Sequence, residues 1–457
     1  MKKIQLQKFT DFANQLLPHE TAYLMSVQQF EDAQKLEILR LVDYNCRHIG
    51  QFSPYDTSID KRKYSHLKNW IQDRLEEIDV DAHYKWMLEL EKKIMTDAID
   101  WTDEKALLKA VRNYRHPGFF FSKFFELLQL YRHFLLIRLR YPDYEVVHGF
   151  LEQYAAAYTF SRETGDRLHR ATNDIVRQYS GGASTSAKWE SWLQEVFYNE
   201  QVEGIQRHMA LIRLTFISFN YRKYDLLREK YDYLDRQLRE GKYYSKRLLV
   251  NYYINRLLLH SSFGEYDQAA FFGYLSIREK THDYILYVNN LCSVLLKLEK
   301  HQQALELMRQ AAPEMRNTQN MFNRVSFVAY YMGALNKNGL HKNAEGYGDT
   351  FLKAYAKEVL SQRWHLFFSH YLEALLYQGQ YEKIIKAIRK HELLVKDQSH
   401  RNKAGYQPNI PAIYHLSQYK EGNIGAEEAK TTLQEIAGRH QASSLMQLIR
   451  RLAPEMV

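Results

Sequence analysis

A tyrosine or histidine recurs at nearly fixed spacing in predicted turns through the second half of this chain, and this feature constrains the fold most. Successive members lie 42, 35, 40 and 40 residues apart, and they are Tyr224, Tyr266, His301, His341 and Tyr381. Self-similarity at such a period indicates stacked helical hairpins, in which each hairpin buries its apolar face against the next. We therefore expect an all-α protein that contains an array of antiparallel helix pairs.

Proline is scarce, which favours long helices. The chain of 457 residues has 8 prolines, and none lies between Pro142 and Pro313. An interior proline would remove a backbone donor and clash with the preceding turn of a helix. Before the repeats, the pattern of apolar residues predicts helices over 31–46, 60–78, 80–98 and 119–139, with a further helix capped by Thr102.

One segment has the composition of a linker. Residues 179–187 are rich in serine, glycine and alanine, which pack no core and leave the backbone flexible. We therefore predict a helical N-terminal domain over 1–178, this linker at 179–187, and the helical repeats over 188–395. An irregular stretch and C-terminal capping helices are predicted over 396–457.

The clearest repeat unit places small residues at fixed positions in two successive helices. Leu291 and Cys292 lie in its first helix, Ala304 and Ala311 lie in its second, and the unit closes at Pro313. This arrangement resembles the tetratricopeptide repeat, and the resemblance covers about residues 205–395. Small side chains let the paired helices approach closely. The resemblance implies a superhelix whose inner groove holds a protein or peptide.

The same resemblance implies which side chains line the inner groove. They fall on the first helix of three successive units: Asn289, Ser293, Lys297, Ser326, Asn336, Lys337, Ser369, Glu373 and Tyr377. The expected function is that of a non-catalytic scaffold or adaptor. An alternative is a peptide-sensing regulator, in which a helical N-terminal effector domain precedes such repeats.

A second alternative is nucleic-acid binding by the segment 221–256, where basic residues alternate with tyrosines. The net charge of +9 is uneven, since residues 201–457 hold 36 basic and 25 acidic side chains. Cations reach phosphates and rings stack on unpaired bases. Acidic residues also alternate along the segment, so pairing on a solvated helix face is the competing explanation. The candidate cations are Arg222, Lys223, Arg228, Arg236, Arg239, Lys242, Lys246 and Arg247.

No residue cluster in the sequence indicates an enzyme, a cofactor or a metal site. His365 and His370 are five residues apart, so they do not share a helix face as metal ligands would. Cys46 and His48 point apart on a helix, which disfavours a catalytic pair. With Cys292 as the second of two cysteines, no disulfide framework is expected.

Two further observations bear on the environment and on a cluster of acids. No secretory leader or membrane-spanning segment is expected, so a cytoplasmic protein is predicted. Four carboxylates gather near one predicted helix junction: Glu76, Glu77, Asp79 and Asp81. Acidic residues are common at helix starts, where they favour the helix dipole, and we interpret these in that way.

Overall fold

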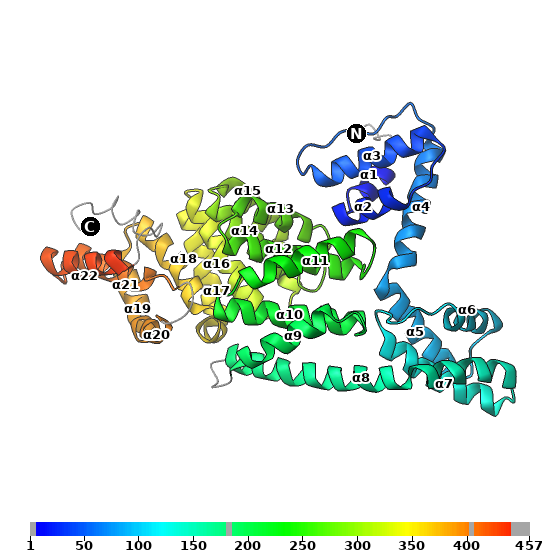
Figure 1. The fold of residues 1–457 in the computed structure, drawn as a ribbon. Coiled ribbons are helices and arrows are strands. Elements are labelled where there is room, and N and C mark those ends of the chain that lie inside the picture. Colours follow the sequence, from blue (N-terminus) through cyan, green and yellow to red (C-terminus); the bar gives the residue numbers. More distant parts are fainter. Residues whose placement is uncertain (1–5, 180–184, 402–405, 440–457) are drawn as a thin grey trace. The chain divides into compact units, whose positions relative to one another are not determined.

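The computed structural model describes residues 6–179, 185–401 and 406–439. These ranges form 22 α-helices and one short 3-10 helix, and no strand occurs in them (Figure 1). The predicted all-α class is confirmed. Among the described residues, no helix is both long enough and apolar enough to cross a bilayer.

The chain divides into two compact units, Met1–Ser262 and Phe263–Val457. Of the predicted linker, residues 180–184 lie outside the described residues. Helix α8 (Tyr141–Tyr179), which precedes them, and helix α10 (Gly204–Tyr221), which follows later, pack together in the first unit. The division between compact units therefore falls elsewhere than the predicted linker, and the domain bounds predicted from sequence stay predictions.

The first unit contains two aromatic-rich cores. Phe9, Leu39, Tyr64 and Ile71 centre the first core, which is formed by helices α1 (Gln7–Ala13), α2 (Pro18–Val27), α3 (Ala33–Arg47) and α4 (Lys61–Ile78). The second core includes Phe121, Leu128 and Tyr131. It is formed by helices α5 (Val80–Met95), α6 (Trp101–Arg112), α7 (Phe121–Ile137) and α8 (Tyr141–Tyr179).

The remaining helices of the first unit continue from the long helix α8, which Figure 1 shows with α7 along one part and α10 along another. They are η1 (Ser186–Trp189), α9 (Glu190–Tyr198), α10 (Gly204–Tyr221), α11 (Asp225–Arg239) and α12 (Lys246–Ser262). Helix α11 also contacts α2, so the start of the chain packs against this later segment.

Two predicted helix boundaries are wrong. Helix α6 is capped by Asp100, whose carboxylate accepts the N–H of Asp103 at 2.9 Å, and not by Thr102. Aspartate is a stronger helix cap than threonine. From position 100 its side chain can accept the N–H of the third residue of the helix. Pro313 does not close its unit, because α15 continues to Asn317. The proline is exposed there, so water can satisfy the helix carbonyl that loses its donor.

The second unit consists of helices packed in sequential pairs. They are α13 (Tyr266–Ser276), α14 (Tyr284–Lys297), α15 (His301–Asn317), α16 (Met321–Lys337), α17 (His341–Ser361), α18 (Trp364–Tyr377), α19 (Tyr381–Lys390), α20 (Leu393–His400), α21 (Asn409–Lys420) and α22 (Ala426–Arg439). Helix α14 also contacts α16, α16 contacts α18, and α18 contacts α21, so the first helices of successive pairs lie side by side.

The turn between paired helices has one recurring geometry. Four of the predicted turn residues are the first residue of a helix, and Tyr224 is the cap of α11. Two positions before each turn residue the backbone is left-handed, with φ between 56° and 76°, at Arg222, Gly264, Glu299, Gly339 and Gly379. After Glu299, Gly339 and Gly379 the next N–H binds the carbonyl five residues back, at 2.9 to 3.0 Å. This bond closes the preceding helix.

The small residues of the predicted repeat lie where helices meet. Each of them is fully buried, with 0% exposure, and they are Ala269, Cys292, Ala304, Ala311 and Ala344. A larger side chain at such a position would hold the two helices apart. The close-packing role predicted for these residues agrees with their burial, and this much of the repeat pattern was predictable from the spacing alone.

The left-handed turn predicts opposite effects for two substitutions. Glu299→Gly should stabilise the protein by up to about 1 kcal/mol, because glycine adopts this conformation without a steric penalty. Gly339→Ala should destabilise it by about 1 kcal/mol. A Cβ at position 339 would meet no atom within 4 Å, so the loss comes from the backbone alone. Chemical denaturation of both variants tests the sign, and effects of the same sign would contradict the shared geometry.

Candidate functional site

Two of the predicted groove residues join successive first helices. The side-chain amide of Asn289 donates to the carbonyl of Asn323 at 3.0 Å, and that of Asn336 donates to the carbonyl of His370 at 2.9 Å. Both donors are almost fully buried, with 2% and 3% exposure. These bonds tie α14 to α16 and α16 to α18, so both asparagines serve the stacking of the helices.

Three further groove candidates are buried, at Ser326, Ser369 and Glu373. The Glu373 carboxylate accepts from Lys337 Nζ at 3.3 Å and lies 3.4 Å from His370 Nδ1. Burial acts to raise the pKa of Glu373, but the bonds and charges of His370 and Lys337 hold that pKa below its ordinary value. Lys337 is therefore the partner of a buried carboxylate.

The rest of the predicted groove set is at least partly accessible. Ser293 is half-buried, and Lys297 is exposed with its ammonium 5.0 Å from the centre of the Tyr266 ring. Tyr377 is half-buried and stacks on His341, with ring centres 4.1 Å apart. These residues remain candidates for partner contact, and the groove assignment stays a prediction.

A hollow that the sequence did not indicate lies among α15, α16 and α17, with a volume of about 600 Å³. Its lining residues are Arg309, Tyr331, Leu335, Leu340, Lys342, Asn343, Gly346, Tyr347 and Thr350. The rings of Tyr331 and Tyr347 meet edge to face at 5.0 Å. No motif in the sequence indicated it, because its lining comes from three different helices.

The cations of segment 221–256 are mostly engaged within the first unit. Lys223 pairs with Glu190 at 2.9 Å, Arg239 with Asp235 at 2.6 Å and Lys242 with Glu240 at 2.8 Å. The Arg236 guanidinium lies 5.9 Å from the centre of the Tyr233 ring. Two others pair with distant helices, Lys246 with Glu20 and Arg247 with Asp81, both at 2.9 Å or less. Arg222 and Arg228 are exposed.

Four of the eight tyrosines of the same segment are buried. Tyr231, Tyr244, Tyr252 and Tyr253 are each at most 5% exposed. Stacking on nucleic-acid bases requires an accessible ring face. These four rings do not provide it, so the structure offers no support for a base-stacking surface built on them.

The buried hydroxyls instead anchor the start of the chain. Tyr253 OH lies 2.7 Å from Nδ1 of His19, and Nε2 of His19 lies 2.9 Å from Asp235. Tyr252 OH donates to Asp235 at 2.6 Å. Next to this group, Tyr244 OH donates to Glu20 at 2.6 Å. We interpret the segment as a buried polar network that holds α2 against α11 and α12.

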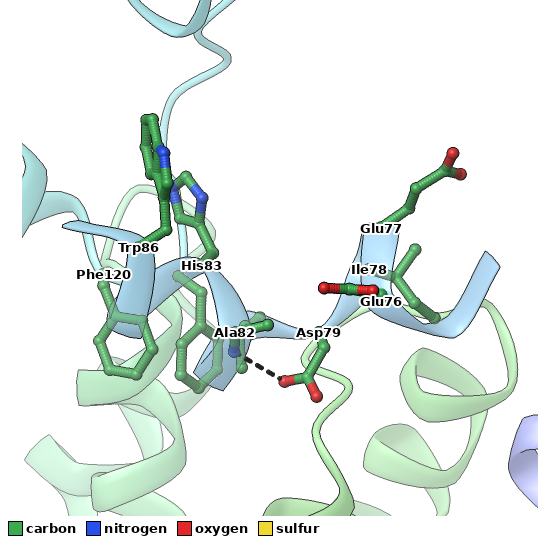
Figure 2. Close-up of a pocket in the computed structure, with 10 residues that line it drawn as sticks. Glu76, Glu77, Ile78, Asp79, Ala82, His83, Trp86 and Phe120 are labelled. Atoms are coloured by element: carbon green, nitrogen blue, oxygen red, sulfur yellow. Dashed lines mark hydrogen bonds between the residues drawn. The ribbon is translucent and has the colours of Figure 1, made fainter. Parts of the chain in front are cut away.

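A second hollow, with a volume of about 380 Å³, lies at the junction of α4 and α5. Figure 2 shows the residues that line it. The rings of His83 and Trp86 stack at 5.1 Å, whereas the Glu77 side chain points away from them. Asp79 accepts the N–H of Ala82 at 3.2 Å and caps α5. Glu77 pairs with Arg74 at 2.8 Å. Asp79 and Glu77 therefore have structural partners.

Other candidate reactive groups are also engaged. The Cys46 thiol donates to the carbonyl of Leu16 at 3.0 Å, and Nδ1 of His48 lies 2.8 Å from the carbonyl of Tyr44. Burial raises the pKa of Cys292 far above its usual range, which makes the thiol unreactive. Among the described residues, no group of three or more histidine, cysteine or acidic side chains is placed to hold a metal ion.

Comparisons of the chain with protein-family models, with curated proteins and with solved structures give no match.

Lys246 and Arg247 form a matched pair that tests the structural role of the basic segment. Lys246→Met should cost about 3 kcal/mol of stability, because it leaves the carboxylate of Glu20, whose side chain is 1% exposed, without its cation. Arg247→Ala should cost less than about 1 kcal/mol, because its pair with Asp81 is solvent-accessible. Chemical denaturation measures both. Equal small effects would show that the Glu20 network does not hold α2 in place.

His208 predicts a pH dependence of stability. Burial and the charge of Arg247 lower its pKa from 6.5 to about 4. Between these values the unfolded chain binds more protons, so the free energy of unfolding should fall as pH falls from about 6.5 to about 4. His208→Gln should reduce that fall by on the order of 1–3 kcal/mol. Denaturation of both proteins at about pH 7.5 and about pH 5 tests this, and parallel losses would contradict it.

Proposed function

We propose that this protein is a non-catalytic scaffold that holds a polypeptide partner on the helix pairs of its second unit. The observation that carries the proposal is the recurrence of one turn and one packing arrangement in successive pairs. Repeated helix pairs of this kind form extended surfaces that suit the binding of chains rather than small molecules. We infer that the second unit is a superhelix similar to the tetratricopeptide repeat.

The bonds between first helices support a continuous surface. The Asn289 and Asn336 amides cross from one first helix to the next, at 3.0 and 2.9 Å. Both donors are buried, so breaking either bond would leave buried polar groups unsatisfied. The two bonds therefore hold neighbouring first helices in a fixed register. A surface in fixed register can present side chains at set spacings to an extended or helical segment.

Two surfaces of the second unit are candidates for the contact. One is the accessible part of the first-helix face, with Ser293, Lys297 and Tyr377. The other is the hollow among α15, α16 and α17. The positive balance of residues 201–457 favours an acidic partner on either surface, since long-range charge steers association.

Cross-linking during native purification tests this function. The tagged full chain is purified from its own cells with and without nuclease, and lysine cross-links to any stoichiometric polypeptide are mapped. We expect a polypeptide that survives nuclease, with cross-links at lysines of the second unit such as Lys297 and Lys342. Cross-links confined to the first unit, or a partner lost with nuclease, would contradict the proposal.

A further inference from the structure

The hollow among α15, α16 and α17 combines an apolar floor with cationic sides. Tyr331, Leu335 and Tyr347 provide the floor, and Arg309 and Lys342 stand on opposite helices beside it. Its volume of about 600 Å³ can take several side chains. This hollow lies between the second helices of two successive pairs, and so apart from the predicted inner groove.

The cations on both sides extend along their helices. Arg316 follows Arg309 by seven residues on α15, and Lys353 follows Gly346 by seven residues on α17. Residues seven apart share a helix face, so each helix presents a row of positive charge. Arg316 and Arg324 are near enough to Tyr347 that their charges oppose the rise of its pKa caused by burial.

Four acidic side chains of these helices, Glu306, Glu314, Glu345 and Asp349, already have partners. On α17, Glu345 pairs with Lys383 at 2.7 Å, and Asp349 pairs with the same lysine at 2.8 Å. On α15, Glu314 pairs with Lys280 at 2.6 Å, and Glu306 accepts from Gln310 at 2.7 Å.

The exposed cations beside the hollow are left without such partners. Within the part of the chain that the structure describes, no carboxylate pairs with Arg309, Arg316, Lys342 or Lys353. Their charge is therefore available to a ligand.

Gly346 lines the hollow. A Cβ at this position would meet no atom within 4 Å, so the glycine faces empty space. Gly348, two residues on, is different, because its Cβ would come within 2.7 Å of Met332 and Tyr371. A large side chain at 346 can therefore fill the hollow without displacing the helices.

We propose that this hollow binds an acidic peptide segment of the partner, with an apolar side chain on the tyrosine and leucine floor and carboxylates on the flanking cations. This inference rests on the proposed function and names the chemistry of its partner. Arg309 and Arg316, seven residues apart on α15, are separated by about 10 Å along the helix. An extended peptide covers that distance in about three residues, so acidic residues about three apart fit best.

A random peptide library displayed on phage and selected on the immobilised full chain tests the proposal. We expect enriched peptides with net negative charge and at least one large apolar residue. Their affinity for the protein should fall at least about tenfold in Arg309→Glu/Lys342→Glu, a loss of about 1.4 kcal/mol, because attraction becomes repulsion. Gly346→Trp should cause a similar loss by filling the hollow, and circular dichroism and thermal melting show that each variant folds.

Two control variants distinguish binding in the hollow from a general effect of the protein's net charge. Arg389→Glu/Lys390→Glu changes the net charge by the same amount on α19 and should leave affinity within about twofold. Gly346→Ala should also retain binding.

Three outcomes would overturn the inference. Enriched peptides that keep their affinity in both hollow variants place binding on another surface, and the scaffold function stands. If no peptide is enriched, both the inference and the peptide-binding function fail. If a labelled 20-residue oligo(U) RNA binds and is lost in Arg309→Glu/Lys342→Glu while peptides do not bind, the ligand is a nucleic acid.

Discussion

The fold of the second unit depends on a left-handed residue two positions before each turn residue. It ends one helix and lets the chain reverse within a few residues, so the next helix packs antiparallel to the first. Glycine occupies this position at Gly339 and Gly379, and Glu299 adopts the same conformation without being glycine. Because the geometry recurs, successive first helices come side by side, and the asparagine bridges and the hollow all follow from that stacking.

The sequence predicted the turns and the small residues because both depend on local patterns. Ala304 and Ala311 are seven residues apart on one helix face, and both are buried. Small side chains are needed where two helices pack closely, so the spacing alone predicts that this face is buried. The helix caps were less predictable. Asp100 and Thr102 both suit a cap, and the choice between them depends on backbone geometry that a sequence does not contain.

The basic segment was harder to interpret because its partners are far away in the chain. Lys246 binds Glu20 across 226 residues, and Arg247 binds Asp81 across 166. Local spacing shows only that cations, acids and rings alternate. The same alternation occurs in a phosphate-binding surface and in a buried polar network, so it does not distinguish them. The hollow was missed for a related reason. Its lining comes from three helices that are separated along the chain.

Hydrogen exchange of the full chain, with and without its co-purified polypeptide, tests the central claim most directly. If the second unit holds the partner, backbone amides of α15 to α17 should exchange more slowly in the complex, while those of α1 to α8 should be unchanged. Slower exchange confined to the first unit would contradict the claim that the stacked helix pairs are the binding surface.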